Sequence, residues 1–587
     1  MPRSQALVRG LAALLAAAPL AAQQLPVVEK TLSNGMRLVM VERHDQPTLA
    51  LGWMARVGSA NERPGITGLA HLFEHMMFKG TKTIGTRDAQ RDAELNDQQD
   101  KVQAGIREEM SLLREAQRRG RIPDMMDPKA RTPRLQKLLD EYEALVKEQR
   151  SLIVKDEMDK IYTQAGGTGL NASTSQDRTF YIISLPSNKL ELWMWLESDR
   201  IANPVFREFY SERNVILEER RQTLESRPGG LVGEAFNAMT WMAHPYHWEV
   251  IGWPSDIAQV TREQANEFFA TYYAPNNLTA ILVGDFNPDQ ALALAEKYLG
   301  RIPANPKGVP EVITQEPAQP AEQRMVAELE TTPGIEVVFK AVPAVHQDAP
   351  ALQALGGILG GAQMFGGRPG AGGGSRPPTG RLSKSLVLDK KVATNAAAMF
   401  RGQKYGGLFT LRATPAQGQT PEALEPLLYA EVDRIVREGV TEEELQRFKN
   451  ATQVGYYTRL ESHTGIRETL AQALATGKVQ DFQEGPKRIQ AVTREDVRRV
   501  ARQYLVKDSR SVLLTHRKGA ESGAAARPGG NPQAMLARIQ EMADPAQLRA
   551  LLERMKGQLA EAPPERKPAV EAAVKAIQER IQKLEGK

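Results

Sequence analysis

One short pattern occurs twice in the 587 residues and constrains the fold more than any other feature. The letters VTRE at 260–263 precede a predicted helix, a tyrosine and an apolar strand at 278–283. The same letters at 492–495 precede a second such helix, another tyrosine and a strand at 511–515. Threonine before a charged first turn is typical of a helix start. A chance match is the alternative, but a chain of this length exceeds one hydrophobic core, so we predict two related α+β halves.

A proline-rich segment marks the expected division between the halves. Five prolines fall between residues 302 and 323, which is typical of a linker. We therefore predict the following parts: a first domain at 27–300, a linker at 301–323, a second domain at 324–517 with a glycine-rich loop at 366–380, and a flexible spacer with a helical tail at 518–587.

The first 22 residues are typical of a signal peptide. Arg3 and Arg9 precede an apolar run at 10–22 that ends in small residues and is too short to span a bilayer stably. A membrane anchor or a buried helix is the alternative. The chain contains no cysteine, which excludes disulfides and thiolate metal ligands. We expect an exported protein, periplasmic in location, with no transmembrane span after signal removal.

The charge balance argues against a nucleic-acid partner. Lys and Arg number 76 against 71 Asp and Glu, a formal net charge of +5. Binding to nucleic acid would require cations clustered on one face, and the sequence contains no such basic block.

The letters HLFEH at 71–75 carry the chemistry. His71 and His75 are four residues apart, so on a helix they project from one face and can hold one metal ion. Glu74 beside them can take a proton from a water molecule and pass it to a leaving amine. Two surface histidines beside an acid are the alternative, but the chain has only 8 histidines, which makes a chance match rare.

A later acidic helix offers the third ligand that zinc needs. Glu212 and Glu219 are seven residues apart and therefore lie on nearly the same helical face. One could bind zinc while the other orients a histidine by a hydrogen bond. Without the histidines, such a helix would be interpreted as a solvated acidic face.

HxxEH followed by E-x6-E resembles the pitrilysin family of zinc peptidases with the inverted motif, which includes insulin-degrading enzyme and the mitochondrial processing peptidase. The resemblance covers roughly residues 27–517. It implies that His71, His75 and Glu219 bind one zinc ion per chain. It also implies that Glu74 is the catalytic base and that Glu212 supports the ligands.

The resemblance also implies a substrate strand in the segment GLNASTSQDRTFY. Asn171 and Ala172 match the edge strand of the family, where the asparagine contacts the substrate backbone. A bound peptide would add to this strand, which gives affinity with little sequence selectivity. A turn residue is the alternative for Asn171.

The chain departs from the family's pattern between the two metal-binding segments. His75 and Glu219 are 144 positions apart (219 − 75), about twice the usual separation. A helical hairpin inserted at 87–160 accounts for the excess, with apolar stripes predicted at Val102, Ile106, Met110 and Leu113 and at Leu135, Leu138, Tyr142 and Leu145. The insertion could roof the substrate chamber, hold a partner, or be a neutral surface addition.

A second departure concerns the half without the metal motif. In the family that half often supplies an Arg and a Tyr, seven apart, which hold the substrate carbonyl. Val387 and Thr394 occupy the matching positions and cannot do so. We therefore expect the chain to pair, as a homodimer or as a heterodimer with a related chain that carries the Arg/Tyr pair.

These observations together predict an α+β fold of two homologous domains. Each domain is expected to be a mostly antiparallel sheet covered by helices, and the two enclose a peptide chamber. The expected activity is zinc-dependent hydrolysis of peptide bonds in unfolded peptides or small proteins. A subunit that binds peptides or scaffolds an assembly without catalysis is the alternative.

Overall fold

The computed structural model describes residues 25–361, 380–518, 548–549, 551–553, 555–556 and 567–585. The chain divides into two compact units, one of residues 1–414 and 420–518 and the other of residues 415–419 and 519–587. In the second unit the helix α20 (Lys567–Glu585) is described. The predicted signal peptide at 1–22, nearly all of the glycine-rich loop and most of the spacer and tail lie outside the described residues.

The first half of the large unit is built on a six-stranded sheet with the order β1-β2-β6-β3-β5-β4. All neighbouring strands are antiparallel except β2 and β6. The strands are β1 (Val28–Thr31), β2 (Arg37–Glu42), β3 (Thr48–Ala55), β4 (Thr168–Thr174), β5 (Thr179–Pro186) and β6 (Leu278–Gly284). The helices are α2 (Leu69–Met76), α3 (Ala89–Arg118), α4 (Pro133–Leu152), α5 (Glu157–Gln164), α6 (Leu190–Ala202), α7 (Phe209–Arg220), α8 (Gly230–Thr240), α9 (Pro254–Gln259), α10 (Arg262–Tyr272) and α11 (Pro288–Tyr298).

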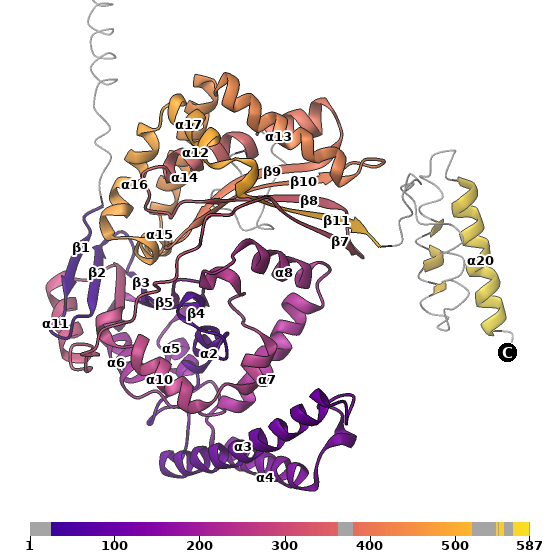
Figure 1. The fold of residues 1–587 in the computed structure, drawn as a ribbon. Coiled ribbons are helices and arrows are strands. Elements are labelled where there is room, and N and C mark those ends of the chain that lie inside the picture. The colour runs from indigo at the N-terminus through magenta and orange to yellow at the C-terminus, as the bar shows by residue number, and fades with distance from the viewer. Residues whose placement is uncertain are drawn as a thin grey trace, which may run out of the picture. The chain divides into compact units, whose positions relative to one another are not determined.

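The second half repeats this plan with a five-stranded sheet in the order β7-β11-β8-β10-β9 (Figure 1). The strands are β7 (Gln323–Leu329), β8 (Gly334–Ala341), β9 (Ala393–Gly402), β10 (Gly407–Pro415) and β11 (Arg510–Arg517). The helices are α12 (Ala349–Gly360), α13 (Pro421–Glu438), α14 (Glu442–Leu460), α15 (His463–Thr476), α16 (Val479–Ala491) and α17 (Arg494–Tyr504).

The repeated VTRE pattern occupies equivalent places in the two sheets. Thr261 and Thr493 cap the helices α10 and α17, and each accepts a backbone N–H with its side chain. The strands that follow, β6 and β11, each lie between a parallel and an antiparallel neighbour. The predicted α+β class with two related, mostly antiparallel halves is therefore confirmed.

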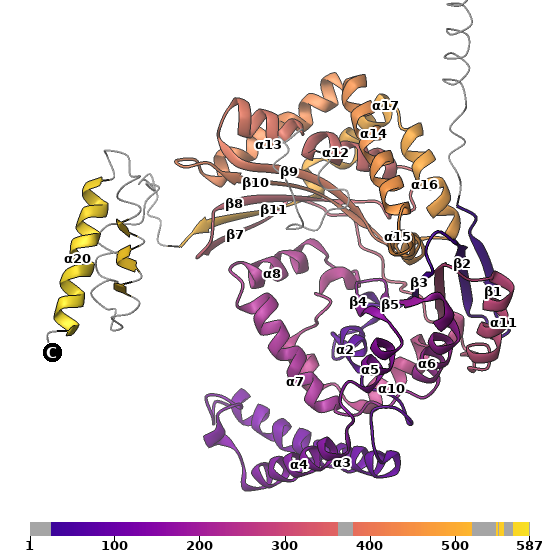
Figure 2. The same ribbon diagram turned by 180° about the vertical axis from the view of Figure 1, so that it is seen from behind.

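Helices of each half pack against the sheet of the other half. In β3 the residues Leu51 and Trp53 face the helices of the first half, whereas Ala50 and Met54 pack against α15 and α16 of the second half. The sheet of the second half in turn packs Val338 and Leu513 against Phe236 of α8. Both views show α15 beside β3 and α8 next to the strands of the second sheet (Figure 1, Figure 2).

The contact between α15 and the first sheet should contribute strongly to stability. Leu470 of α15 is fully buried in the cluster that joins the halves. We expect Leu470→Ala to lower the free energy of unfolding by about 2–5 kcal/mol, because the change removes buried methyl groups and leaves a cavity. Urea unfolding followed by circular dichroism measures this. Leu112→Ala, at a side chain that is 62% exposed, is the matched control; equal losses in both variants would contradict the expectation.

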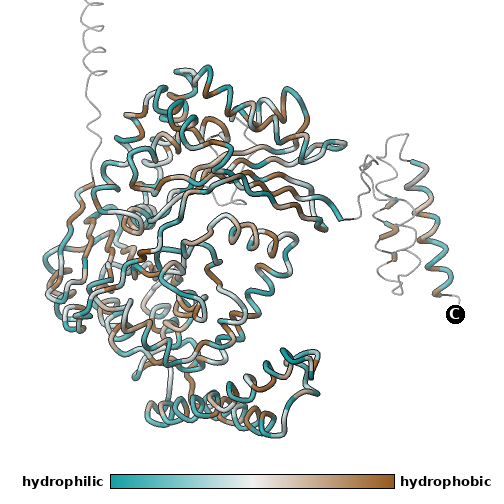
Figure 3. Tube along the Cα trace, in the orientation of Figure 1, coloured by the Kyte–Doolittle hydropathy of each residue, from teal (hydrophilic) through white to brown (hydrophobic). Residues whose placement is uncertain are grey.

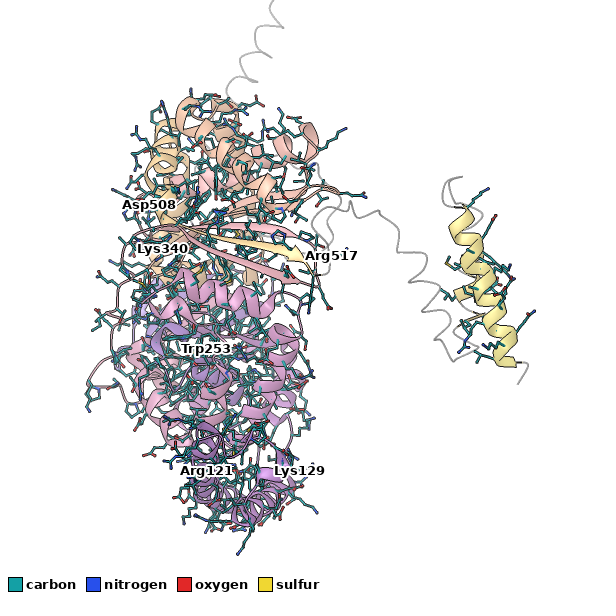
Figure 4. The ribbon with its side chains drawn as sticks, turned by 45° about the vertical axis from the view of Figure 1, so that its right-hand side comes forward. Arg121, Lys129, Trp253, Lys340, Asp508 and Arg517 are labelled. Atoms are coloured by element: carbon teal, nitrogen blue, oxygen red, sulfur yellow. The ribbon has the colours of Figure 1, made fainter. Side chains whose placement is uncertain are left out.

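The inserted hairpin consists of α3 and α4, which pack against each other. Figure 3 shows mostly hydrophilic residues along both helices. Arg121 and Lys129 lie in the connection between the two helices, at the lower end of the large unit in Figure 4. None of the helices in the described parts of the chain is long and apolar enough to cross a membrane.

Candidate functional site

The helix α2 sets the directions of the HLFEH side chains. Leu72, Phe73 and Met76 are at most 2% exposed and pack into the core of the first half. The helical period therefore turns the other side chains of the motif away from the core. The rings of His71 and His75 lie 4.9 Å apart on that side.

Glu62 holds the start of this helix. The residue before α2 is Gly68, which adopts φ +86° and has no side chain to cap the helix. The carboxyl group of Glu62 instead accepts the N–H of Gly68 at 2.9 Å and that of Ala70 at 2.7 Å. These bonds satisfy backbone donors that a helix start leaves free. Burial nevertheless raises the pKa of Glu62 to about 8, although the two N–H groups act in the opposite direction.

The raised pKa of Glu62 predicts a pH dependence of stability. An exposed glutamate has a pKa of 4.5, so between about pH 4.5 and 8 the folded chain keeps a proton that the unfolded chain has lost. The free energy of unfolding should therefore fall as pH rises through this window. Glu62→Gln removes the titrating group. The free energy of unfolding of the wild type minus that of the variant, measured by urea unfolding, should therefore decrease from pH 5 to pH 8. Parallel pH profiles of the two proteins would contradict this.

The helix α7 brings Glu219 to the two histidines. One carboxylate oxygen of Glu219 lies 3.5 Å from Nε2 of His75 and 3.8 Å from Nε2 of His71. One ligand atom from each of the three residues lies within 4.8 Å of the others. These separations are longer than good hydrogen bonds, whereas ligand atoms around a tetrahedral zinc ion lie about 3.3 Å apart. The donor set of two imidazoles and one carboxylate therefore fits a zinc ion.

A buried arginine fixes the end of α7 next to Glu219. Arg220 is only 2% exposed, and its guanidinium binds both carboxylate oxygens of Glu234 on α8. It also donates to the carbonyl of Gly252. A π-helical turn (Arg221–Glu225) follows directly. The bidentate pair ties the direction of the Glu219 side chain to the packing of α8.

Glu212 binds the other nitrogen of His75. Its carboxylate lies 2.9 Å from Nδ1 of His75 and 2.6 Å from the ammonium of Lys79. Burial alone would raise the pKa of Glu212, but the hydrogen bond with His75 and the charge of Lys79 lower it overall. The ionised carboxylate fixes the ring of His75 with Nε2 directed toward Glu219, as partners of metal-binding histidines do.

Burial keeps His71 in the form that binds a metal. Burial first, and then repulsion by His75, lowers the pKa of His71 to about 4. The imidazole is therefore neutral near pH 7, and a neutral nitrogen has the lone pair that a metal ligand requires.

Glu74 lies beside this cluster and contacts β4, the edge strand of the sheet. The hydroxyl of Thr174 donates to one oxygen of Glu74 at 2.6 Å, which leaves the other oxygen for a second partner. Burial raises the pKa of Glu74, although the Thr174 hydrogen bond lowers it. A carboxylate with a raised pKa is a better proton acceptor.

The predicted substrate residues Asn171 and Ala172 lie on β4. This strand ends the strand order and pairs only with β5, so its other edge has no neighbour in the described sheet. Asn171 is exposed, and Ala172 is 9% exposed on the opposite face. Val387 lies in a π-helical stretch (Ser383–Asp389), and Thr394 is exposed in β9, both in the second half.

Three residues at the site were not among the candidates from the sequence: Glu62, Lys79 and Thr174. Thr174 is two positions after Ala172, so the alternation of a strand could have placed both on one face. Lys79 is four positions after His75, but the chain turns between them, and no local rule pairs it with Glu212. Nothing in the sequence around Glu62 indicates that it caps a helix six residues later.

Two models of one protein family match most of the chain. The model described as Insulinase (Peptidase family M16) matches residues 37–165 and 154–252. The model described as Peptidase M16 inactive domain matches residues 259–452. The first of these matches lies within the first half, and the second runs from the end of α9 in the first half into α14 in the second.

Two bacteria, Helicobacter pylori and Escherichia coli, have proteins that are similar to this chain. The chain is 26% identical over 493 residues to a protein of Helicobacter pylori named zinc protease PqqE. This alignment covers 82% of this chain and 91% of that protein. A crystal structure of a protease from Helicobacter pylori has a TM-score of 0.66 at 23% identity and covers 84% of this chain and 99% of that one. The periplasmic protease PqqL from Escherichia coli has a TM-score of 0.59 at 18% identity, covering 86% of this chain and 49% of that one.

Proposed function

Because the chain belongs to the insulinase family of peptidases, M16, we propose that it is a zinc-dependent metalloendopeptidase that acts on unfolded peptides or small proteins. The observation that carries the proposal is the grouping of His71, His75 and Glu219, with ligand atoms within 4.8 Å of one another. A relative at 26% identity is named a zinc protease, which supports the same metal.

Different residues of the chain bind the metal and transfer the proton. His71, His75 and Glu219 would hold one zinc ion per chain, which when bound supplies a Lewis acid that lowers the pKa of water and polarises a carbonyl. Glu74 takes a proton from the attacking water with the oxygen that Thr174 leaves free, and then passes it to the leaving amine. Glu212 keeps the ring of His75 in place through its hydrogen bond to Nδ1.

The free edge of β4 supports binding of an extended peptide. A peptide that adds to this edge would form backbone hydrogen bonds beside Asn171 and Ala172, close to the Thr174 contact with Glu74. Backbone bonds select for an extended chain rather than for its side chains. Substrates would therefore be unfolded. We also propose that the two halves enclose a chamber around the bound peptide.

Val387 and Thr394 favour a second candidate, an enzyme that is complete only in a heterodimer with a related chain, because a second copy of this chain would carry the same two residues. Neither side chain can hold a substrate carbonyl as an Arg/Tyr pair would. A partner chain would then supply that pair. A subunit that binds peptides without catalysis is the further alternative, and the presence of Glu74 beside the ligands argues against it. The periplasmic location stated for PqqL supports an exported protein.

Turnover of a quenched peptide by the purified chain tests the proposal. Cleavage that stops with a chelator and returns with zinc supports the metallopeptidase. No cleavage at any zinc concentration, by the chain alone or with a related partner, would overturn it. Full activity of a chain that light scattering shows to be monomeric would exclude the need for a partner.

A further inference from the structure

The inserted hairpin contacts the rest of the first half through polar side chains. Four polar residues along the first part of α3 are buried, each at most 6% exposed: Asp92, Asn96, Gln99 and Gln103. Residues of these types are rarely buried unless they are paired. Gln149 of α4 donates to both Asp92 and Asn96, which joins the two helices within the same network. A polar interface of this kind is satisfied in only one docking geometry, because every group needs its partner.

The first connection from this network to the site passes through Arg207. Its guanidinium donates to Asp92 at 2.9 Å, and both side chains are 1% exposed. The same guanidinium donates to the carbonyls of Thr81, Ile84 and Lys79. It therefore fixes the backbone from which the ammonium of Lys79 reaches Glu212, the partner of His75.

The second connection reaches α7 directly. The hydroxyl of Tyr210 donates to Asp100 of the hairpin, and Arg213 donates to Gln103 at 3.3 Å. Arg262 of α10 also pairs with Asp100, at 2.9 Å. Tyr210 and Arg213 lie on either side of Glu212 in the sequence. The helix α7 is thus held by the hairpin through some of its side chains and contacts α2 through Glu212.

We propose that the inserted hairpin is a positioning element of the metal site, which holds α7 and Lys79 so that Glu212 and Glu219 meet the histidines of α2. The proposal rests on the proposed function of Glu219 as a zinc ligand. The hairpin residues of the two connections contact Arg207, Tyr210, Arg213 and Arg262 rather than the three ligands, so their effect would be on the affinity for zinc. The far loop around Arg121 and Lys129 has no part in this role.

Two substitutions weaken the second connection, and Asp100→Asn is the one that takes the carboxylate partner from a buried charge, because the side chain of Arg262 is 8% exposed. Tyr210→Phe removes only the hydroxyl, and Asp100→Asn keeps a side chain of the same shape while Asp100 is 41% exposed. Glu148→Gln is the control, because it breaks an ion pair with Arg91 that lies wholly within the hairpin. The zinc dissociation constant of each full-length chain is measured by competition with a chromogenic chelator, and the thermal midpoint of each metal-free chain is measured in parallel.

We expect Tyr210→Phe and Asp100→Asn to weaken zinc binding by about tenfold, the lower end of the effect of groups that support metal ligands. Glu148→Gln should bind zinc as the wild type does. Equal zinc affinity in the wild type and both anchoring variants would overturn the positioning role alone. So would an equal loss in the control. A wild-type chain that binds no zinc would overturn the proposed function and this inference together.

Discussion

Replacing Glu74 with glutamine should lower kcat/KM for peptide hydrolysis by about 10²–10⁴-fold while the chain keeps its zinc. Glutamine has the shape of glutamate, and its carbonyl oxygen can still accept the hydrogen bond from Thr174. It cannot take a proton from water. His71, His75 and Glu219 are unchanged in this variant, so the affinity for zinc should stay near that of the wild type.

The test of Glu74 needs both activity and metal content on the same sample. Cleavage of a quenched peptide gives kcat/KM, and atomic absorption gives zinc per chain. Glu218→Gln is the matched control, because Glu218 is an exposed glutamate of α7 that pairs with Arg221 and not with the site. Normal turnover by a zinc-loaded Glu74→Gln chain would remove Glu74 from the role of base. A comparable loss in the control would assign the effect to the charge near α7 instead.

Contacts within one helix could be predicted from the sequence, whereas contacts between distant segments could not. The four-residue spacing of His71 and His75 fixes their common direction by local geometry alone. Glu219 is 144 positions from His75 (219 − 75), and only the resemblance to a known family joined the two segments. The structure brings them together because α7 packs against α2, which no periodicity in either helix reveals.

The surface on which the hairpin docks also could not be predicted from the sequence. The apolar stripe with Val102 and Leu113 was predicted, and both residues are buried in the structure. Asp92 and Asn96 are typical of a solvated helix face, and they are buried because Arg207 and Gln149 lie opposite them. Burial of a polar residue depends on a partner that can be far away in the chain. The packing of α8 and α15 against the sheet of the other half could not be predicted for the same reason.

Glu219 should be essential for the metal itself, in contrast to Glu74. Zinc sites with a full set of protein ligands have binding free energies of about 10–16 kcal/mol, or about 3 kcal/mol per ligand. Loss of one ligand should therefore weaken zinc binding by at least about 100-fold. Glu219→Ala should lose zinc on dialysis and with it all peptide cleavage. The metal-free chain should remain folded, because the Glu219 side chain is 37% exposed and its removal leaves no buried cavity.

The neighbouring acidic residues do not offer a replacement for Glu219. Glu212 binds Nδ1 of His75, the nitrogen on the other side of the ring from Nε2, so it cannot reach the same ion. Glu218 is bound to Arg221 on the outer face of α7. Glu218→Ala is therefore the matched control and should keep wild-type zinc stoichiometry when both variants are measured by atomic absorption after dialysis. Unchanged zinc content in Glu219→Ala would show that the third ligand is another residue. The contact of α7 with α2 would then have no role in binding the metal.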